Sequence, residues 1–128
     1  MEDHAGQAVT PAGEHRLYHF WATFCAPCVA ELPTLQRNAP RLAAGGLAVY
    51  AIANEADWTA VDRVFPNGVP DFVYRMTSPD YAAAQVVHVL PTTLIVGGDG
   101  KVERRLEGAV DWDAVDPGHL EAVRLVGH

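Results

Sequence analysis

Cys25-Ala26-Pro27-Cys28 contains the only two cysteines of this 128-residue chain. The pair follows a strand-like run, residues 17–21, and opens a helical run that begins at Val29. A helix N-terminus presents unpaired N–H groups and the positive end of the helix dipole, so it favours a thiolate over a thiol. Two thiols at this spacing can close a disulfide and open it again. The sequence therefore predicts thiol–disulfide exchange, with Cys25 as the nucleophile and Cys28 as the resolving thiol.

Other uses of a cysteine pair fit less well. A c-type haem site requires His directly after the second Cys, and this chain has Val29 there. A zinc site needs four ligands; His15 and His19 on one strand would lie roughly 13 Å apart, at about 3.3 Å per residue. A structural disulfide across so short a loop would constrain the unfolded chain little. No metal site is therefore predicted, and a copper-binding metallochaperone remains the alternative function, because soft thiolates suit cuprous copper.

The composition predicts a single globular domain. The chain is 49% hydrophobic, which allows a sizeable core, and its net charge of −7 argues against nucleic acid as a partner. We expect a lead-in segment over residues 1–15 and the folded domain over 16–128. No run is long enough to cross a membrane, and Met1-Glu2-Asp3-His4 does not begin a signal peptide.

Strand-like and helix-like segments alternate along the chain. Their order predicts an α/β fold, a mixed central sheet with helices on both faces. The expected strands are 16–22, 47–53, 72–74, 92–96 and 101–106, and the expected helices are 26–44, 58–65, 78–87 and 116–127.

Two segments carry a family resemblance. Residues 20–33, FWATFCAPCVAELP, resemble the active-site segment of thioredoxin-fold thiol–disulfide oxidoreductases, and specifically the TlpA/ResA-like branch of cytochrome c maturation type. Residues 89–102, VLPTTLIVGGDGKV, are similar to the cis-proline loop and following hairpin of that family. Between them, residues 57–75 match the extra helix and strand that this branch inserts. The resemblance implies a thioredoxin-like fold with one helix–strand insertion.

The resemblance also implies how the protein works in the cell. It suggests a disulfide reductase that needs no cofactor, acts on protein disulfides as a monomer and contributes to cell redox homeostasis. Its electrons would come from a membrane or thioredoxin-type reductant. The expected compartment is the periplasm, either free or held by a membrane anchor, with the signal or anchor preceding this chain.

The resemblance further assigns residues to substrate binding. Leu90 would expose its backbone to a substrate strand, next to a cis peptide bond at Pro91. Trp21, Phe24 and Pro27 would flank the thiols. For Trp21, packing in the core is the competing interpretation. Phe24 also departs from the family pattern, which has Trp before the first Cys.

Two further side chains are candidates for proton transfer to and from Cys28. Glu31 lies one helical turn after Cys28 on nearly the same face, and an acid at this position moves the proton of the buried thiol in the resembled branch. A solvated helix Glu is the alternative. His19 stands where thioredoxins carry a buried Asp and shares a strand face with Trp21. It could accept the proton, or it could simply be a packed, hydrogen-bonded His.

Overall fold

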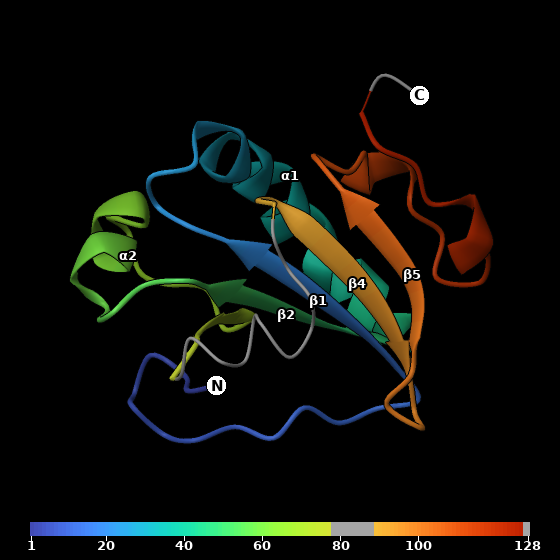
Figure 1. Cartoon of the computed structure of the whole chain (residues 1–128), viewed down its shortest axis with the longest axis horizontal. Helices are drawn as coiled ribbons and strands as arrows, with labels where there is room; N and C mark the ends of the chain where they lie inside the picture. The colour runs from blue at the N-terminus through green and yellow to red at the C-terminus, as the bar shows by residue number, and fades with distance from the viewer. Residues whose placement is uncertain (78–88, 127–128) are drawn as a thin grey trace.

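A five-stranded mixed sheet forms the centre of the computed structural model, which describes residues 1–77 and 89–126 (Figure 1). The strand order is β3-β2-β1-β4-β5. The central strand β1 runs parallel to β2 and antiparallel to β4. The strands span His15–Trp21 (β1), Leu47–Ala53 (β2), Val73–Arg75 (β3), Thr92–Gly97 (β4) and Val102–Glu107 (β5). All five predicted strands and the mixed sheet are confirmed, with ends that differ by at most one residue.

The first predicted helix is also confirmed. Helix α1 spans Ala26–Ala44, whereas the second helix, α2, is shorter than predicted and spans Thr59–Val64. The N-cap residue Trp58 makes no side-chain cap bond, but the Asp57 carboxylate accepts a hydrogen bond from the backbone N–H of Thr59, the first residue of α2, at 2.8 Å. The helix predicted over 78–87 lies outside the described residues. Within the described ranges, no helix has the length and apolar character needed to cross a bilayer.

Strand β1 is buried on both faces of the sheet because its side chains alternate between two core clusters. Leu17 and Trp21 pack with apolar residues of α1, including Leu32. Tyr18 and Phe20 point to the opposite face and join a separate cluster there. His19 therefore projects toward α1, the same side as Trp21, and is fully buried.

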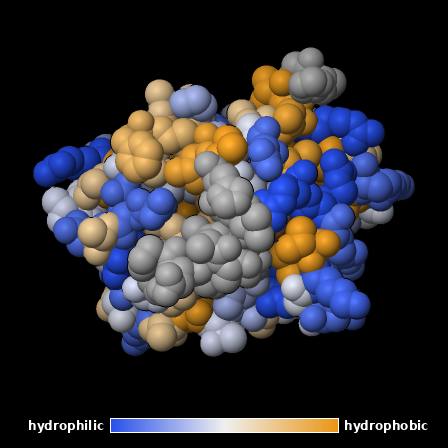
Figure 2. Space-filling view, viewed as in Figure 1, coloured by the Kyte–Doolittle hydropathy of each residue, from blue (hydrophilic) through white to orange (hydrophobic). Residues whose placement is uncertain are grey.

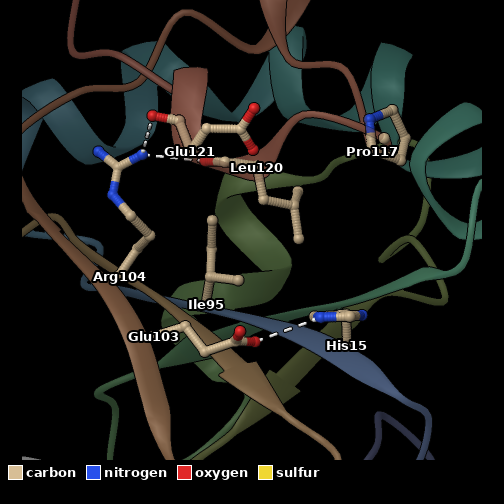
Figure 3. A pocket seen from close by; sticks show the side chains of 8 residues that line it. His15, Ile95, Glu103, Arg104, Pro117, Leu120 and Glu121 are labelled. Carbon is tan, nitrogen blue, oxygen red and sulfur yellow. Dashed lines mark hydrogen bonds and ion pairs between the residues drawn. The ribbon is translucent and has the colours of Figure 1, made fainter.

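The predicted helix over 116–127 is wrong for the described residues 116–126. This segment contains only a short 3-10 turn, η2, at Leu120–Ala122. Arg104 on β5 accounts for the irregular path, since its guanidinium donates hydrogen bonds of 2.9–3.0 Å to three backbone carbonyl oxygens, those of Leu120, Glu121 and Val123. Figure 3 shows two of these bonds. A side chain thus occupies carbonyls that would otherwise be available to a continuing helix.

The segment before β1 is attached to the far edge of the sheet. Glu2 and Arg75 exchange two backbone hydrogen bonds of 3.0 Å. The Glu2 carboxylate also accepts from the Arg75 guanidinium at 2.7 Å and from the indole N–H of Trp58 at 2.9 Å. These contacts hold the N-terminal residues against β3 and the segment that leads into α2.

Candidate active site

Cys25 and Cys28 are joined by a disulfide at the N-terminus of α1, with their Cα atoms 5.2 Å apart. Cys25 is the N-cap residue, with extended backbone angles, and its Sγ accepts a hydrogen bond from the Cys28 N–H at 3.3 Å. Pro27 lies in the first turn, where its missing N–H leaves no helical bond unmade. Cys25 is partly exposed, whereas Cys28 is fully buried. The two sulfurs therefore occupy different environments, one reachable from solvent and one enclosed.

The loop that leads into Cys25 is fixed by a residue that the sequence analysis missed. Glu55, which follows β2, accepts a hydrogen bond from the Thr23 backbone N–H at 2.7 Å and another from the Thr23 hydroxyl. Its own backbone carbonyl accepts from Arg75. Because β1 and β2 are parallel, their carboxyl ends share one edge of the sheet. A carboxylate just after β2 is thus a usable sequence signal for a contact to this loop.

The predicted flanking residues differ in exposure. Phe24 is 77% exposed and Pro27 is also exposed, so both lie on the surface beside the disulfide. Trp21 is fully buried and packs edge-on against Phe65, with ring centroids 6.2 Å apart. This position supports the core-packing interpretation of Trp21. A contact between Trp21 and substrate stays a prediction.

The Leu90–Pro91 peptide bond is cis, as predicted. Thr92 pairs with Phe20 near the carboxyl end of β1, so the Pro91 loop lies at the end of the sheet that leads to Cys25. Pro91 is buried, Leu90 is partly exposed and the preceding Val89 is 46% exposed. Figure 2 shows apolar side chains gathered over the region where α1 and β4 begin.

Glu31 is buried within α1, three residues after Cys28. Its carboxylate oxygen Oε2 accepts two hydrogen bonds of 2.7 Å, one from the Val110 backbone N–H and one from the indole Nε1–H of Trp112. Burial raises the pKa of Glu31 to about 7, although both hydrogen bonds act in the opposite direction. The alternative of a solvated helix Glu is therefore wrong. One helical turn separates this carboxyl group from the buried Cys28.

His19 lies next to Glu31, and the two side chains are 0% and 2% exposed. Its Nδ1 is 3.0 Å from the Thr93 hydroxyl, and its ring meets Trp112 edge-on with centroids 5.6 Å apart. Its Nε2 is 3.5 Å from Oε1 of Glu31. Burial lowers the pKa of His19 to about 3, so the imidazole is neutral at ordinary pH. Sequence analysis missed Trp112, because nothing local marks a residue so far along the chain as a neighbour of Glu31.

A cavity of about 370 Å³ lies elsewhere, on the α1 face at the opposite end of β1 (Figure 3). His15, the first residue of β1, lines it and pairs with Glu103 at 3.3 Å. The disulfide follows the last residue of the same strand, so this cavity is separate from the thiol site. In the described part of the chain, no group of three or more His, Cys, Asp or Glu side chains is placed to hold a metal ion.

The chain is similar in sequence and in fold to proteins named thiol–disulfide oxidoreductases. No family model matches the chain. A thiol-disulfide oxidoreductase ResA from Oceanobacillus iheyensis is 25% identical over 118 residues, covering 87% of this chain and 58% of the relative. ResA from Bacillus thuringiensis is 28% identical over 112 residues, covering 87% and 64%. The crystal structure of StoA from Bacillus subtilis superposes with a TM-score of 0.76 at 18% identity, covering 88% of this chain and 89% of that one. The chain therefore has a thioredoxin-like fold and is similar in sequence to ResA proteins. It spans less than two thirds of the length of either ResA relative.

Proposed function

We propose that this domain is a thiol–disulfide oxidoreductase that reduces disulfides of other proteins. The supporting observation is the asymmetry of the Cys25–Cys28 pair, in which the helix-capping sulfur is reachable and the second sulfur is enclosed. In the reduced protein, the Cys25 thiolate attacks one sulfur of a substrate disulfide, and the other substrate sulfur leaves as a thiolate that takes up a proton. The Cys28 thiolate then attacks Cys25 Sγ and releases the second substrate thiolate. Two electrons pass to the substrate, and the Cys25–Cys28 disulfide forms.

The two thiols have different requirements for ionisation. Cys25 caps α1, so the Cys28 N–H and the positive end of the helix dipole stabilise its thiolate. Cys28 is fully buried, and burial disfavours a thiolate. A proton acceptor near Cys28 is therefore needed in the resolving step. Glu31 fits this role, because it lies one turn away and has a pKa of about 7, close to the working pH of a general base.

The substrate would bind over the exposed residues around the disulfide. Phe24 and Pro27 offer apolar surface on the side of α1, and Leu90 lies on the side of β4. Pro91 has no N–H to give to a neighbouring strand, so it leaves the backbone of Leu90 to pair with an extended substrate segment. This arrangement favours unfolded or extended protein segments as substrates.

The partners and the compartment belong to the same proposal. The resemblance to ResA supports an extracytoplasmic site, a role in cytochrome c maturation, a membrane or thioredoxin-type reductant and action as a monomer. The copper-chaperone alternative gains no support, since it needs a His beside the thiols. The ring nitrogens of His19 face Thr93 and Glu31 instead. Fractionation of the native protein tests the compartment, and a purely cytosolic pool would contradict it.

The thiol assignment is tested by alkylation of the reduced protein across a range of pH. We expect Cys25 to react first and to remain reactive below its usual pKa of about 8.5, because the helix end stabilises its thiolate. The variant Cys28→Ser should trap substrate as a mixed disulfide, and the matched control Cys25→Ser should trap none. Faster alkylation of Cys28, or two thiols that both stay unreactive below about pH 8, would show that the assignment is wrong.

A further inference from the structure

His19 and Glu31 each have one polar atom without a hydrogen-bond partner in the described part of the chain, and these two atoms face each other. They are Nε2 of His19 and Oε1 of Glu31, 3.5 Å apart. The side chains are 0% and 2% exposed, so bulk solvent does not reach either atom. Unpaired buried polar atoms are rare in folded proteins, so each one calls for a physical explanation. His19 and Glu31 are also the two residues that the sequence predicts as candidates for accepting the proton of Cys28.

The hydrogen bonds of Glu31 determine which of its oxygens can carry a proton. Oε2 already accepts from both the Val110 N–H and the Trp112 Nε1–H at 2.7 Å. A proton on Oε2 would compete with these two donors. A proton taken up by the carboxylate therefore belongs on Oε1, where the group that faces it is Nε2 of His19.

The hydrogen bond at the other ring nitrogen completes the arrangement. For Nε2 to accept a proton from Oε1, the neutral imidazole must carry its own hydrogen on Nδ1. Nδ1 lies 3.0 Å from the Thr93 hydroxyl oxygen, which can accept that hydrogen. Both ring nitrogens then have suitable partners: Nδ1–H donates to the Thr93 hydroxyl oxygen, and the lone pair of Nε2 faces Oε1 of Glu31.

We propose that His19 is a positioning residue that holds the proton accepted from Cys28 on Oε1 of Glu31, and that Thr93 fixes the tautomer of His19 required for this. The inference rests on the proposed function and names a second residue for its proton-transfer step. The S–H bond of Cys28 breaks, an O–H bond forms at Oε1, and this O–H donates to Nε2. The electron pair left on Cys28 attacks Cys25 Sγ. The imidazole remains neutral throughout.

The groups that face this pair come from three elements. Cys28 lies on α1, which also carries Glu31 itself; Thr93 belongs to β4; and the indole of Trp112 comes from η1, Trp112–Ala114, shortly after the Val110 N–H that also bonds Glu31. Thr93 and Trp112 do not titrate in the working range, so the titratable groups here are Cys28, Glu31 and His19, and all three are buried. Charge on any one of them therefore changes the proton affinity of the others.

The first experiment is ¹⁵N NMR of the imidazole of His19 in reduced, full-length protein. We expect a neutral ring with the hydrogen on Nδ1 from about pH 5 to about pH 6.5, where Glu31 holds its proton and an ordinary His changes its charge. A hydrogen on Nε2, or a ring that becomes charged in this range, would overturn the inference. This measurement uses the wild-type chain, so it does not depend on whether a variant folds.

The second experiment follows the carboxyl carbon of Glu31 by ¹³C NMR in His19→Asn. Asn places its amide near the Nδ1 position but supplies no acceptor at the Nε2 position. We expect Glu31 to bind its proton about tenfold more weakly, which corresponds to one lost buried hydrogen bond. Thr93→Val, which frees the tautomer, should shift the titration in the same direction. The pH dependence of the resolving step should move with it.

These outcomes separate the inference from the proposed function. The titration of Glu31 and the tautomer of His19 are read without turnover, so they are informative even if the protein reduces no disulfide. Normal disulfide reduction by His19→Asn, with an unchanged Glu31 titration and pH profile, would overturn only the role of His19. Failure of Cys25 to attack any disulfide would overturn the proposed function and leave the tautomer measurement standing.

Discussion

Replacing Glu31 by Gln should make the oxidised protein more stable at alkaline pH. Gln has the shape of a protonated Glu. Its amide oxygen can accept the hydrogen bonds from Val110 and Trp112 that Oε2 accepts now, and its amide N–H can donate to Nε2 of His19. The variant therefore keeps the contacts of the protonated acid and removes the ionisation. Since burial raises the pKa of Glu31, ionisation of this group opposes folding.

The size and the pH window follow from that shift. The pKa of Glu31 is about 7 in the folded protein against a reference of 4.5. Below pH 4.5 the group is protonated in both states and contributes no difference. Between pH 4.5 and about 7 the unfolded chain releases its proton first, so wild-type stability falls as pH rises. The total loss is about 3 kcal/mol, because each tenfold change in proton affinity is worth ~1.4 kcal/mol.

The assay is urea denaturation of the oxidised protein at a series of pH values, for wild type and Glu31→Gln. The difference in unfolding free energy should be small near pH 4 and rise to about 3 kcal/mol above pH 7. Because the lowered pKa of His19 makes stability rise with pH between about 3 and 6.5 in both proteins, the comparison is read above pH 6.5, where His19 is neutral in the folded and unfolded states. The exposed Glu107→Gln is a matched control. A pH-independent difference, or a variant less stable than wild type at pH 8, would refute the buried-acid interpretation.

Two further predictions concern the C-terminal part of the domain. Trp112→Phe removes one donor to the Glu31 carboxylate and should raise the pKa of Glu31 further, which ¹³C NMR can follow. Trp58→Phe, which loses an indole donor far from this site, is the control, and an equal shift in both variants would contradict the role of Trp112. Arg104→Ala should lower the free energy of unfolding by about 1–3 kcal/mol, because it leaves carbonyl oxygens without their donor. Replacing the exposed Lys101 by Ala should change the free energy of unfolding little in the same urea titration. Equal stability of both variants would show that the hydrogen bonds of Arg104 do not stabilise the C-terminal segment.

The sequence predicted those helices and strands that are determined by residues within or next to the element itself. Helix α1 was predicted at both ends because Cys25 stands at its start and Gly45 follows its last residue. Strand β2 was predicted because an apolar run of that length matches a buried strand. The cis bond at Pro91 was predicted from the resemblance of its motif. In each case the decisive residues lie within a few positions of the element.

Interactions between distant segments could not be predicted in this way. Asp116-Pro117 is a good helix start, yet the described residues after it are mostly irregular, because Arg104 binds carbonyls there from another strand. The acidity of Glu31 also depends on distant residues, since its two donors, Val110 and Trp112, belong to this C-terminal part. His19 could be placed on the correct face from the strand period, but its distance to Glu31 required the packing of α1 on the sheet.

The irregular path after β5 has a direct connection to the thiol site. Gly108 follows β5 with φ of 129°, a conformation that side-chain-bearing residues rarely adopt, and its N–H donates to the Pro91 carbonyl at 2.9 Å. The chain therefore turns away from the ladder immediately beside the Pro91 loop. Two residues later, the N–H of Val110 points at Glu31 instead of a neighbouring strand. The backbone bonds between this segment and residues 124–126 use the Ala109 carbonyl and the Asp111 N–H, which leaves the Val110 N–H for Glu31. The turn at Gly108 thus links the segment that would receive substrate to the buried acid that would receive the proton of Cys28.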